Sequence, residues 1–224
     1  MCRIRLFIAA ALIACTGQVM ADTLKIAVIG AGNVGGTLGT LWVKAGHEVM
    51  FSSRHPEQLQ TLVEAAGPKA RAGSVSDAAA WGDVIVLSVP YGAMPVLSEQ
   101  LKGQLAGKVV FSTSNPFSGR DGEVGRTALD QGVALADQQY LPGVHLVRAF
   151  NAIGAASMKS QSGTGKAIAT FADDAQARET GARLVRDAGF VPVLLPLSRA
   201  NEGLPGGPAS GVLSEAQIRQ KLGL

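Results

Sequence analysis

The sequence predicts an α/β fold, a doubly wound parallel sheet with helices on both faces. Three observations predict it. Apolar strand-like runs alternate with helix-like runs, a glycine-rich turn separates the first strand from the first helix, and polar residues follow several of the strands. The 224 residues, 47% of them hydrophobic and 17% charged, suffice for one well-packed domain. No second domain of conventional size is expected beside it.

The first strand and the turn after it are the most informative part of the chain. Residues 24–29 form an apolar, β-branched run, typical of a strand buried on both faces of a sheet. Gly30 then permits a tight turn, Gly32 lets the backbone approach a pyrophosphate, and Gly35 lets the next helix pack on the strand. That helix, expected at 34–45, points N–H groups and a positive dipole end at the phosphates. The pattern predicts a Rossmann domain that binds a dinucleotide.

The second strand, expected at 48–51, indicates which dinucleotide is bound. About 20 residues past the first glycine, NAD enzymes place Asp or Glu to accept hydrogen bonds from the ribose hydroxyls. This chain has Ser52, Ser53 and Arg54 there. Hydroxyls and a guanidinium suit a 2′-phosphate, whereas a carboxylate would repel it. The residues therefore favour NADP(H) over NAD(H).

The alternation continues to the end of the chain. Further strands are expected at 84–89, 109–112, 144–149, 167–171 and 190–195, and further helices at 57–66, 93–101, 127–139 and 175–188. Residues 201–211, rich in Gly and Pro, should form a loop or a covering arm. Ser214, three residues before Gln217, predicts a capped final helix.

Ligands of an open sheet lie outside the carboxyl ends of its strands. The motifs and these strand ends together give the expected cofactor-binding residues: Gly30, Ala31, Gly32, Asn33, Val34, Gly35, Ser52, Ser53, Arg54, Ser88, Val89, Pro90, Asn115 and Asn151. Asn115 is either a turn residue before Pro116 or a cofactor contact, and both interpretations stay open. For Asn151 a ligand role is favoured over a helix cap.

No catalytic residue and no metal site are predicted. His47, His55 and His145 are scattered at strand starts or in loops, and no His/Asp/Ser set or carboxylate pair has motif spacing. We expect His145 to be structural. Residues 22–224 carry 18 basic and 17 acidic side chains, because two of the 20 basic residues and none of the acidic ones precede them. No nucleic-acid surface is implied.

The first 21 residues have the pattern of an export signal. Arg3 and Arg5 precede an apolar run at 6–14, and small residues lead to a cleavage position after Ala21. The run is too short for a stable membrane span. We expect an exported protein with one domain at 22–224; lipidation of Cys15 and an unused signal in a cytoplasmic protein are the alternatives. Both cysteines, Cys2 among them, lie in this segment, so the mature chain would have no disulfide, catalytic thiol or Cys-ligated metal.

Three motifs together resemble the deazaflavin-dependent NADP reductase family, the coenzyme F-420 type. They are the glycine turn at 26–35, the Ser-Ser-Arg-His-Pro-Glu segment at 52–57 and the Val-Arg-Ala-Phe-Asn segment at 147–151. The cytosolic reductase domain of the six-transmembrane metalloreductases is similar too. The likeness covers about residues 24–197. It implies NADP(H) over the glycine turn, its 2′-phosphate at Ser53 and Arg54, and its nicotinamide near Val89, Pro90 and Asn151.

The resemblance also implies a reaction, hydride transfer between NADPH and the flat ring of a deazaflavin or flavin. Such a step needs little acid–base machinery, because the cofactors hold the chemistry. The alternative is a non-catalytic NADP(H)-binding or sensing module. A small imine or keto-acid reductase would need a helical dimerisation domain, for which the chain is too short. Either this domain itself holds the acceptor, or a homodimer supplies the other wall of its site.

Overall fold

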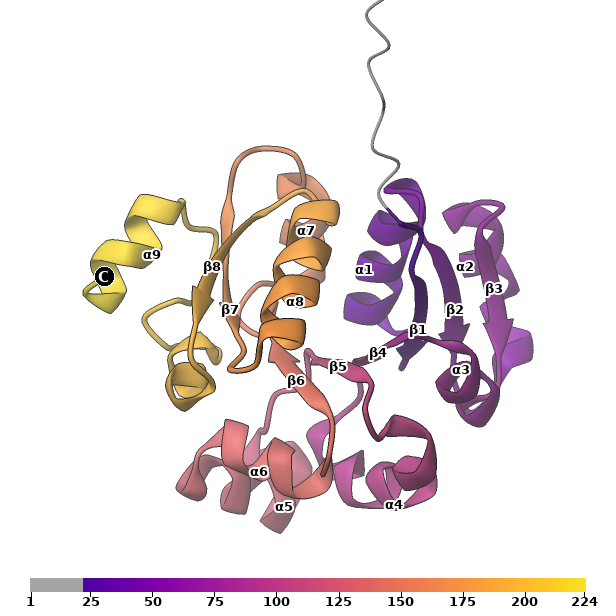
Figure 1. The fold of residues 1–224 in the computed structure, drawn as a ribbon, viewed down its shortest axis with the longest axis horizontal. Helices are drawn as coiled ribbons and strands as arrows, with labels where there is room; N and C mark the ends of the chain where they lie inside the picture. Colours follow the sequence, from indigo (N-terminus) through magenta and orange to yellow (C-terminus); the bar gives the residue numbers. More distant parts are fainter. Residues whose placement is uncertain (1–21) are drawn as a thin grey trace, which may run out of the picture.

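The computed structural model describes residues 22–224, so the expected export signal and Cys15 lie outside the described residues. Its centre is an eight-stranded sheet with the order β3-β2-β1-β4-β5-β6-β7-β8 (Figure 1). The strands are β1 (Lys25–Ile29), β2 (Glu48–Ser52), β3 (Ala70–Gly73), β4 (Val84–Leu87), β5 (Val109–Ser112), β6 (His145–Arg148), β7 (Ala167–Phe171) and β8 (Val191–Leu195). The order reverses beside β1, which is the switch point where ligands of such sheets bind.

Helices cover both faces of the sheet, which confirms the predicted doubly wound α/β fold. They are α1 (Asn33–Lys44), α2 (Gln60–Ala66), α3 (Val75–Trp81), α4 (Met94–Leu105), α5 (Ser118–Gln131), α6 (Val133–Tyr140), α7 (Ala155–Gln161), α8 (Ala175–Asp187) and α9 (Glu215–Leu222). Short 3-10 turns occur at η1 (Pro56–Leu59), η2 (Tyr91–Ala93) and η3 (Leu197–Gly203). Helices α1, α2, α7 and α8 cover one face, and α3, α4, α6 and α9 the other, with α5 against α6.

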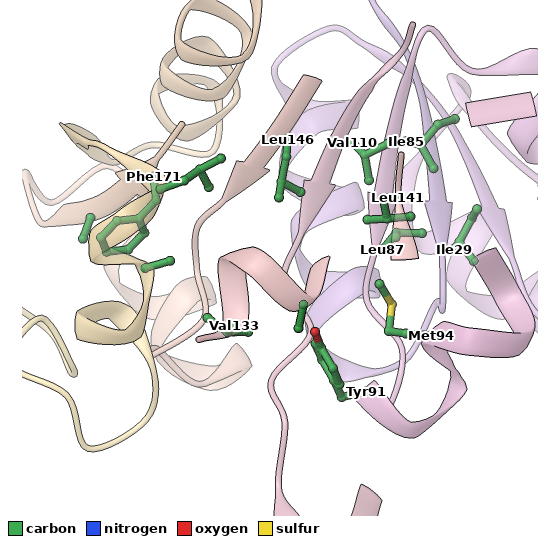
Figure 2. Close-up of a cluster of buried hydrophobic side chains, with 14 of the residues drawn as sticks. Ile29, Ile85, Leu87, Tyr91, Met94, Val110, Val133, Leu141, Leu146 and Phe171 are labelled. Atoms are coloured by element: carbon green, nitrogen blue, oxygen red, sulfur yellow. The ribbon is translucent and has the colours of Figure 1, made fainter. Parts of the chain in front are cut away.

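The core divides into two layers because successive residues of a strand point to opposite faces. Ile26 and Val28 join the cluster beneath α1 and α8, while Ala27 and Ile29 join the cluster beneath α3 and α4. Figure 2 shows the second cluster, to which β1, β4, β5 and β6 contribute side chains and which also contains Tyr91 and Met94. Both faces of β1 are therefore apolar, which explains its continuous hydrophobic run.

The last two strands differ from an all-parallel sheet. β6 pairs antiparallel with β7 through Arg148 and Phe171, and β8 then runs parallel to β7. The connection from β6 to β7 contains α7, which has seven residues, followed by positive-φ turns at Gly163 and Gly165. The last residue of β7, Phe171, lies opposite Arg148, the last residue of β6. The start of β7 lies beyond the carboxyl end of β6, where Ala167, Ile168 and Ala169 line a small cavity with residues 150–153.

Several elements escaped the sequence analysis. β3 and α3 were not predicted, and neither was α7. The helix expected at 127–139 is two helices, α5 and α6, which meet at Gly132 with φ of 95°. A residue with positive φ ends a right-handed helix, and glycine takes it without steric cost. The expected helix at 57–66 begins as the 3-10 turn η1.

The Gly- and Pro-rich segment near the end of the chain covers the end of β6, as expected of a covering arm. The Gly211 N–H donates to the Ala152 carbonyl at 2.9 Å, and Ala167 forms a bridge with Leu213. The predicted cap of the final helix is confirmed, because Ser214 and Gln217 form a reciprocal capping box at the start of α9. Within residues 22–224, no helix has the length and apolar character needed to cross a membrane.

Candidate functional site

Two of the motif glycines are required by close packing. Gly30 has φ of 96°, and a Cβ there would lie within 3.0 Å of the Ser88 carbonyl. A Cβ at Gly35 would lie equally close to the Gly30 carbonyl and to Val28. Both positions therefore exclude a side chain, as the sequence predicted for the turn and for the contact between helix and strand.

Gly32 is different, because no atom lies within 4 Å of the place its Cβ would take. Gly32 is the N-cap of α1, so no side chain caps the first N–H groups of the helix. The first turn of α1 also contains no acidic residue. The N–H groups of Asn33, Val34 and Gly35 have no partner in residues 22–224. Unpaired amides at the start of a 12-residue helix, beside open space, form a binding place for an anion.

Ser52 supports the glycine turn from inside the protein. Its side chain is buried and its hydroxyl donates to the Val28 carbonyl at 3.1 Å. Its own carbonyl accepts from the Gly30 and Ala31 N–H groups at 3.1 and 3.3 Å. We expected this hydroxyl to contact the cofactor, but it is buried and bonded to β1 and so is not exposed to a ligand.

The next two residues are open to solvent at the end of β2. The Ser53 hydroxyl accepts from the His55 N–H at 3.0 Å, and Ser53 is half-buried. Arg54 is exposed and makes no hydrogen bond or ion pair within residues 22–224. A free guanidinium beside a hydroxyl suits a phosphate monoester, which accepts charge-assisted hydrogen bonds from both.

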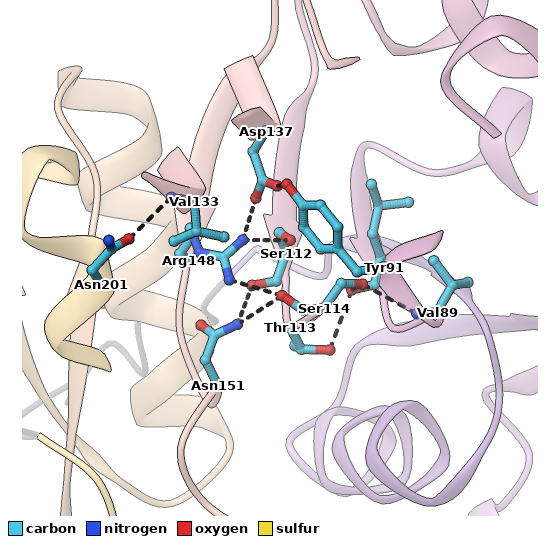
Figure 3. Close-up of polar contacts among 11 residues, drawn as sticks. Val89, Tyr91, Ser112, Thr113, Ser114, Val133, Asp137, Arg148, Asn151 and Asn201 are labelled. Carbon is cyan, nitrogen blue, oxygen red and sulfur yellow. Dashed lines mark hydrogen bonds and ion pairs between the residues drawn. The ribbon is translucent and has the colours of Figure 1, made fainter. Parts of the chain in front are cut away.

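The other end of the site lies where β4, β5 and β6 end. The Val89 N–H donates to Ser114 Oγ at 3.3 Å, and Ser88 and Val89 are half-buried while Pro90 is exposed. Asn115 Nδ2 donates to the Asn151 carbonyl at 2.6 Å (Figure 3 shows the surrounding contacts). The structure thus brings together the three strand ends that the sequence analysis singled out.

Two amide oxygens at this end are buried without a partner. Asn151 Nδ2 donates to the carbonyls of Ser112 and Ser114, both at 3.4 Å, whereas Oδ1 of Asn151 and Oδ1 of Asn115 accept nothing within residues 22–224. A buried acceptor without a donor costs about 1 to 3 kcal/mol. Asn151 is only 7% exposed, so solvent does little to offset this cost. Its oxygen is suited to accept from a bound ligand.

A strained residue places Asn151. Phe150 has φ of 60°, and among residues 22–224 it is the only non-glycine residue with a positive φ. Its ring lies between those of Phe111 and Phe190, with centroids 6.2 and 5.5 Å away. Such backbone strain costs on the order of 1 to 3 kcal/mol and is typical of functional sites. Aromatic packing holds the turn that presents Asn151.

A polar network beneath the strand ends was missed by the sequence analysis. Arg148 is fully buried, pairs with Asp137, and donates to Ser112 Oγ at 3.2 Å and to the Ser114 carbonyl at 2.8 Å (Figure 3). Tyr91 donates its hydroxyl to Asp137 at 2.7 Å. Burial, together with the adjacent carboxylate, raises the pKa of Tyr91 far above its ordinary value, so the hydroxyl stays protonated. The sequence signal that could have revealed this network was Arg148 itself, a charged residue in an otherwise apolar strand.

Asp121 joins the loop after β4 to the start of α5. Its carboxylate accepts from the N–H groups of Gly92 and Phe117 at 3.0 and 2.8 Å, and pairs with Arg120. Burial alone would raise the pKa of Asp121, but the hydrogen bonds from Arg120, Phe117 and Gly92 outweigh it and lower that pKa. Arg120 also donates to the Asn115 carbonyl at 2.8 Å, so this pair steadies one side of the site.

Two of the histidines, His47 and His145, lie at the opposite ends of their strands from the site, whereas His55 follows Arg54 directly. His47 bonds to Asp187 at 2.9 Å and accepts from the Leu24 N–H, and His145 bonds to Asp174. His55 is exposed beside Glu57. Among residues 22–224, no three His, Cys, Asp or Glu side chains are grouped to hold a metal ion. The site therefore offers amides, hydroxyls and a guanidinium.

Comparison with known proteins agrees with this geometry. Residues 25–116 match the family model described as NADP oxidoreductase, coenzyme F420-dependent. The metalloreductase STEAP3 of Rattus norvegicus is 26% identical over 195 residues, which are 84% of this chain and 38% of that protein. The chain thus spans about two fifths of the length of this curated relative.

Solved structures share the fold. A hypothetical protein from Sinorhizobium meliloti is 26% identical with a TM-score of 0.73, over 84% of this chain and 93% of that one. A proposed F420-dependent NADP reductase from Arthrobacter sp. FB24 is 23% identical with a TM-score of 0.62, over 79% and 87%. A pyrroline-5-carboxylate reductase from Coxiella burnetii is 19% identical with a TM-score of 0.62, over 84% and 66%. The match of residues 25–116 to the coenzyme F420-dependent NADP oxidoreductase model, together with these relatives, confirms the resemblance that the sequence motifs carry.

Proposed function

We propose that this protein transfers a hydride between NADPH and a flat-ring acceptor of the deazaflavin or flavin type. One observation carries the proposal: the site is incomplete at both of its ends. Free amides and the free Arg54 guanidinium lie at one end, and the unpaired oxygens of Asn115 and Asn151 lie at the other. All of them follow strands along one edge of the sheet, where an extended dinucleotide lies in this fold.

Each group of site residues would bind a different part of the cofactor. The amides of residues 33–35 would bind the pyrophosphate over Gly32, where a side chain is missing and space is open. Ser53 and Arg54 would hold the 2′-phosphate. Asn151, with Asn115, would accept hydrogen bonds from the nicotinamide carboxamide, whose NH₂ group supplies the donors that these oxygens lack.

The chemistry makes modest demands on the chain. Bound NADPH supplies the hydride, two electrons and one proton together, and becomes NADP⁺ as the acceptor ring is reduced. Any further proton that the reduced ring takes up comes from solvent. The chain orients the nicotinamide through Asn151, which Phe150 and its aromatic neighbours hold in place. A role of this kind agrees with the scattered histidines.

Names of relatives support a reductase without specifying the acceptor. The Rattus norvegicus protein is named a metalloreductase, and the Arthrobacter protein is described as F420-dependent. The assay therefore offers several acceptors. NADPH and NADH are titrated by fluorescence, and absorbance at 340 nm is followed with deazaflavin, FMN, FAD and ferric chelates. We expect NADPH-dependent turnover with a ring acceptor. Tight NADPH binding without turnover on any acceptor would contradict the proposal and favour a sensing module.

Export and assembly are separate proposals. We propose that the first 21 residues direct the protein out of the cytoplasm, which their basic, apolar and small-residue pattern supports. Fractionation of the source cells and mass determination of the mature chain test it. A chain beginning at Asp22 agrees with cleavage, a lipid-modified chain beginning at Cys15 indicates an anchor, and an intact cytoplasmic chain contradicts export. Sedimentation with and without NADPH tests whether the protein forms the homodimer that would supply the other wall of its site.

A further inference from the structure

A buried ion pair lies directly beneath the proposed nicotinamide end of the site. The side chains of Arg148, from β6, and Asp137, from α6, are both 0% exposed. Replacing such a pair by apolar residues is often neutral or favourable for stability, because desolvation of two charges offsets their attraction. Arg148 Nε has no partner, so the arrangement is not optimised for stability alone. Its contacts suggest another use.

The pair and Tyr91 connect the three strand ends that form the site. Tyr91, which follows β4, donates to Asp137, while Arg148 at the end of β6 donates to Ser112 and Ser114 at the end of β5 (Figure 3). Tyr91, Ser112, Asp137 and Arg148 are all 0% exposed, and Ser114 is buried as well. One guanidinium and one carboxylate therefore connect the three loops.

The network also determines which way Asn151 points. The carbonyls of Ser112 and Ser114 take the Nδ2 group of Asn151, and Arg148 holds both of these serines. With Nδ2 committed to the protein, Oδ1 is left as a free acceptor. Ser114 Oγ also accepts from the Val89 N–H, so the same serine holds the backbone just after β4.

We propose that Tyr91, Asp137 and Arg148 are positioning residues for the nicotinamide. They hold the ends of β4, β5 and β6 so that the unpaired oxygens of Asn115 and Asn151 face one planar carboxamide. The inference rests on the proposed function, because it assigns the nicotinamide to this end of the site. It predicts that damage to the network is felt by the nicotinamide half of the cofactor and spared by the adenosine half.

The test compares two ligands that differ in the nicotinamide. NADPH contacts both ends of the site, whereas 2′-phospho-ADP-ribose lacks the nicotinamide. Tyr91→Phe removes the hydroxyl that reaches Asp137 and keeps the ring. The control is Tyr140→Phe, because the Tyr140 ring packs edge-on against Tyr91 at 6.4 Å and its hydroxyl makes no hydrogen bond within residues 22–224.

We expect Tyr91→Phe to raise the Kd for NADPH by about threefold to tenfold, the range of coupling carried by residues that touch neither ligand directly. The Kd for 2′-phospho-ADP-ribose should change less than twofold, and Tyr140→Phe should change neither. Equal weakening of both ligands by Tyr91→Phe, or no weakening of either, would overturn the inference. Failure of the unaltered protein to bind NADPH would instead overturn the proposed function and, with it, this inference.

A second variant separates positioning from stability. Tyr91→Phe, Asp137→Leu and Arg148→Met together remove all three polar groups, so no buried charge is left unpaired. We expect this triple variant to melt at a higher temperature than Arg148→Met alone and to bind 2′-phospho-ADP-ribose normally, yet to keep the weakened NADPH binding. Recovery of NADPH affinity together with stability would show a purely structural network and overturn the inference.

Discussion

Three glycines of one turn have different physical roles. Gly30 and Gly35 are enclosed by backbone carbonyls, while Gly32 faces open space. All three were predicted from the motif, but their separate roles were visible only in the packing. Asn115 shows the reverse: its sequence position left turn and ligand roles open, and its unpaired buried oxygen now favours the ligand role. Which residues form the site was thus predictable from the sequence, whereas the space around Gly32 and the unpaired oxygen of Asn115 depend on tertiary packing.

The glycines make the first prediction. Gly35→Ala should lower the free energy of unfolding by about 1 to 3 kcal/mol, because its Cβ would overlap the Gly30 carbonyl. Gly32→Ala should lower that free energy by at most about 1 kcal/mol, the N-cap preference of glycine over alanine, since nothing surrounds its Cβ. It should still weaken NADPH binding by about tenfold or more, equivalent to 1.4 kcal/mol. Urea unfolding and fluorescence titration measure the two effects. Unchanged NADPH affinity in Gly32→Ala would refute a pyrophosphate over this residue.

Arg54 makes the second prediction. Arg54→Ala should weaken NADPH binding by about 1.5 to 3 kcal/mol, the contribution of a hydrogen bond to a charged group, and spare NADH. Arg126→Ala is the matched control, because Arg126 is an exposed arginine on α5 that pairs only with Glu123. Calorimetric titration of both dinucleotides provides the comparison. Equal losses for NADPH and NADH would show that Arg54 does not contact the 2′-phosphate.

Elements were predictable where periodicity and caps are strong. β5, β7 and the capped α9 follow their sequence signals closely. β3 was missed because Ala70–Gly73 has small residues and an arginine in place of an apolar run, as suits a partly exposed edge strand. The network of Tyr91, Asp137 and Arg148 was missed for another reason: its members come from three elements, and no local pattern connects them.

Asp121, at the start of α5, makes a prediction at this scale. Its pKa is lowered below the ordinary 3.8, so folding favours its charged form. The stabilisation is therefore complete above the unfolded-state pKa and is lost as pH falls through the lower folded-state pKa. The melting temperature should fall more steeply below about pH 4 in the unaltered protein than in Asp121→Asn, because the variant has no carboxylate to protonate.

The control for this measurement is Asp130→Asn, an exposed carboxylate on the same helix that makes no ion pair within residues 22–224. Its melting curve should keep the pH dependence of the unaltered protein. Parallel curves for Asp121→Asn and the unaltered protein would contradict the stabilisation of the Asp121 carboxylate by Arg120, Phe117 and Gly92.

The whole molecule is built around one sheet, and the proposed site lies at the carboxyl ends of its central strands. The β1–β4 region supplies the switch point and the glycine turn, and β5 and β6 supply the amide oxygens. The reversal of β7 and β8 was not predicted, because strand direction depends on how far α7 carries the chain and not on the strand sequences. The start of β7 lies beside residues 150–153, and there Gly211 of the arm donates to Ala152, next to Asn151.

Hydride transfer is tested most directly by isotope. NADPH carrying deuterium at the reactive C4 position is mixed with the protein and oxidised deazaflavin without oxygen, and the reduced deazaflavin is analysed by mass spectrometry. Because the accepting atom of a deazaflavin is a carbon, a transferred deuterium stays on the ring. We predict that deuterium from one of the two C4 faces of NADPH appears in the product, with loss of absorbance at 340 nm. Reduced deazaflavin without deuterium from either face, or no reduction of any acceptor by bound NADPH, would contradict hydride transfer at this site.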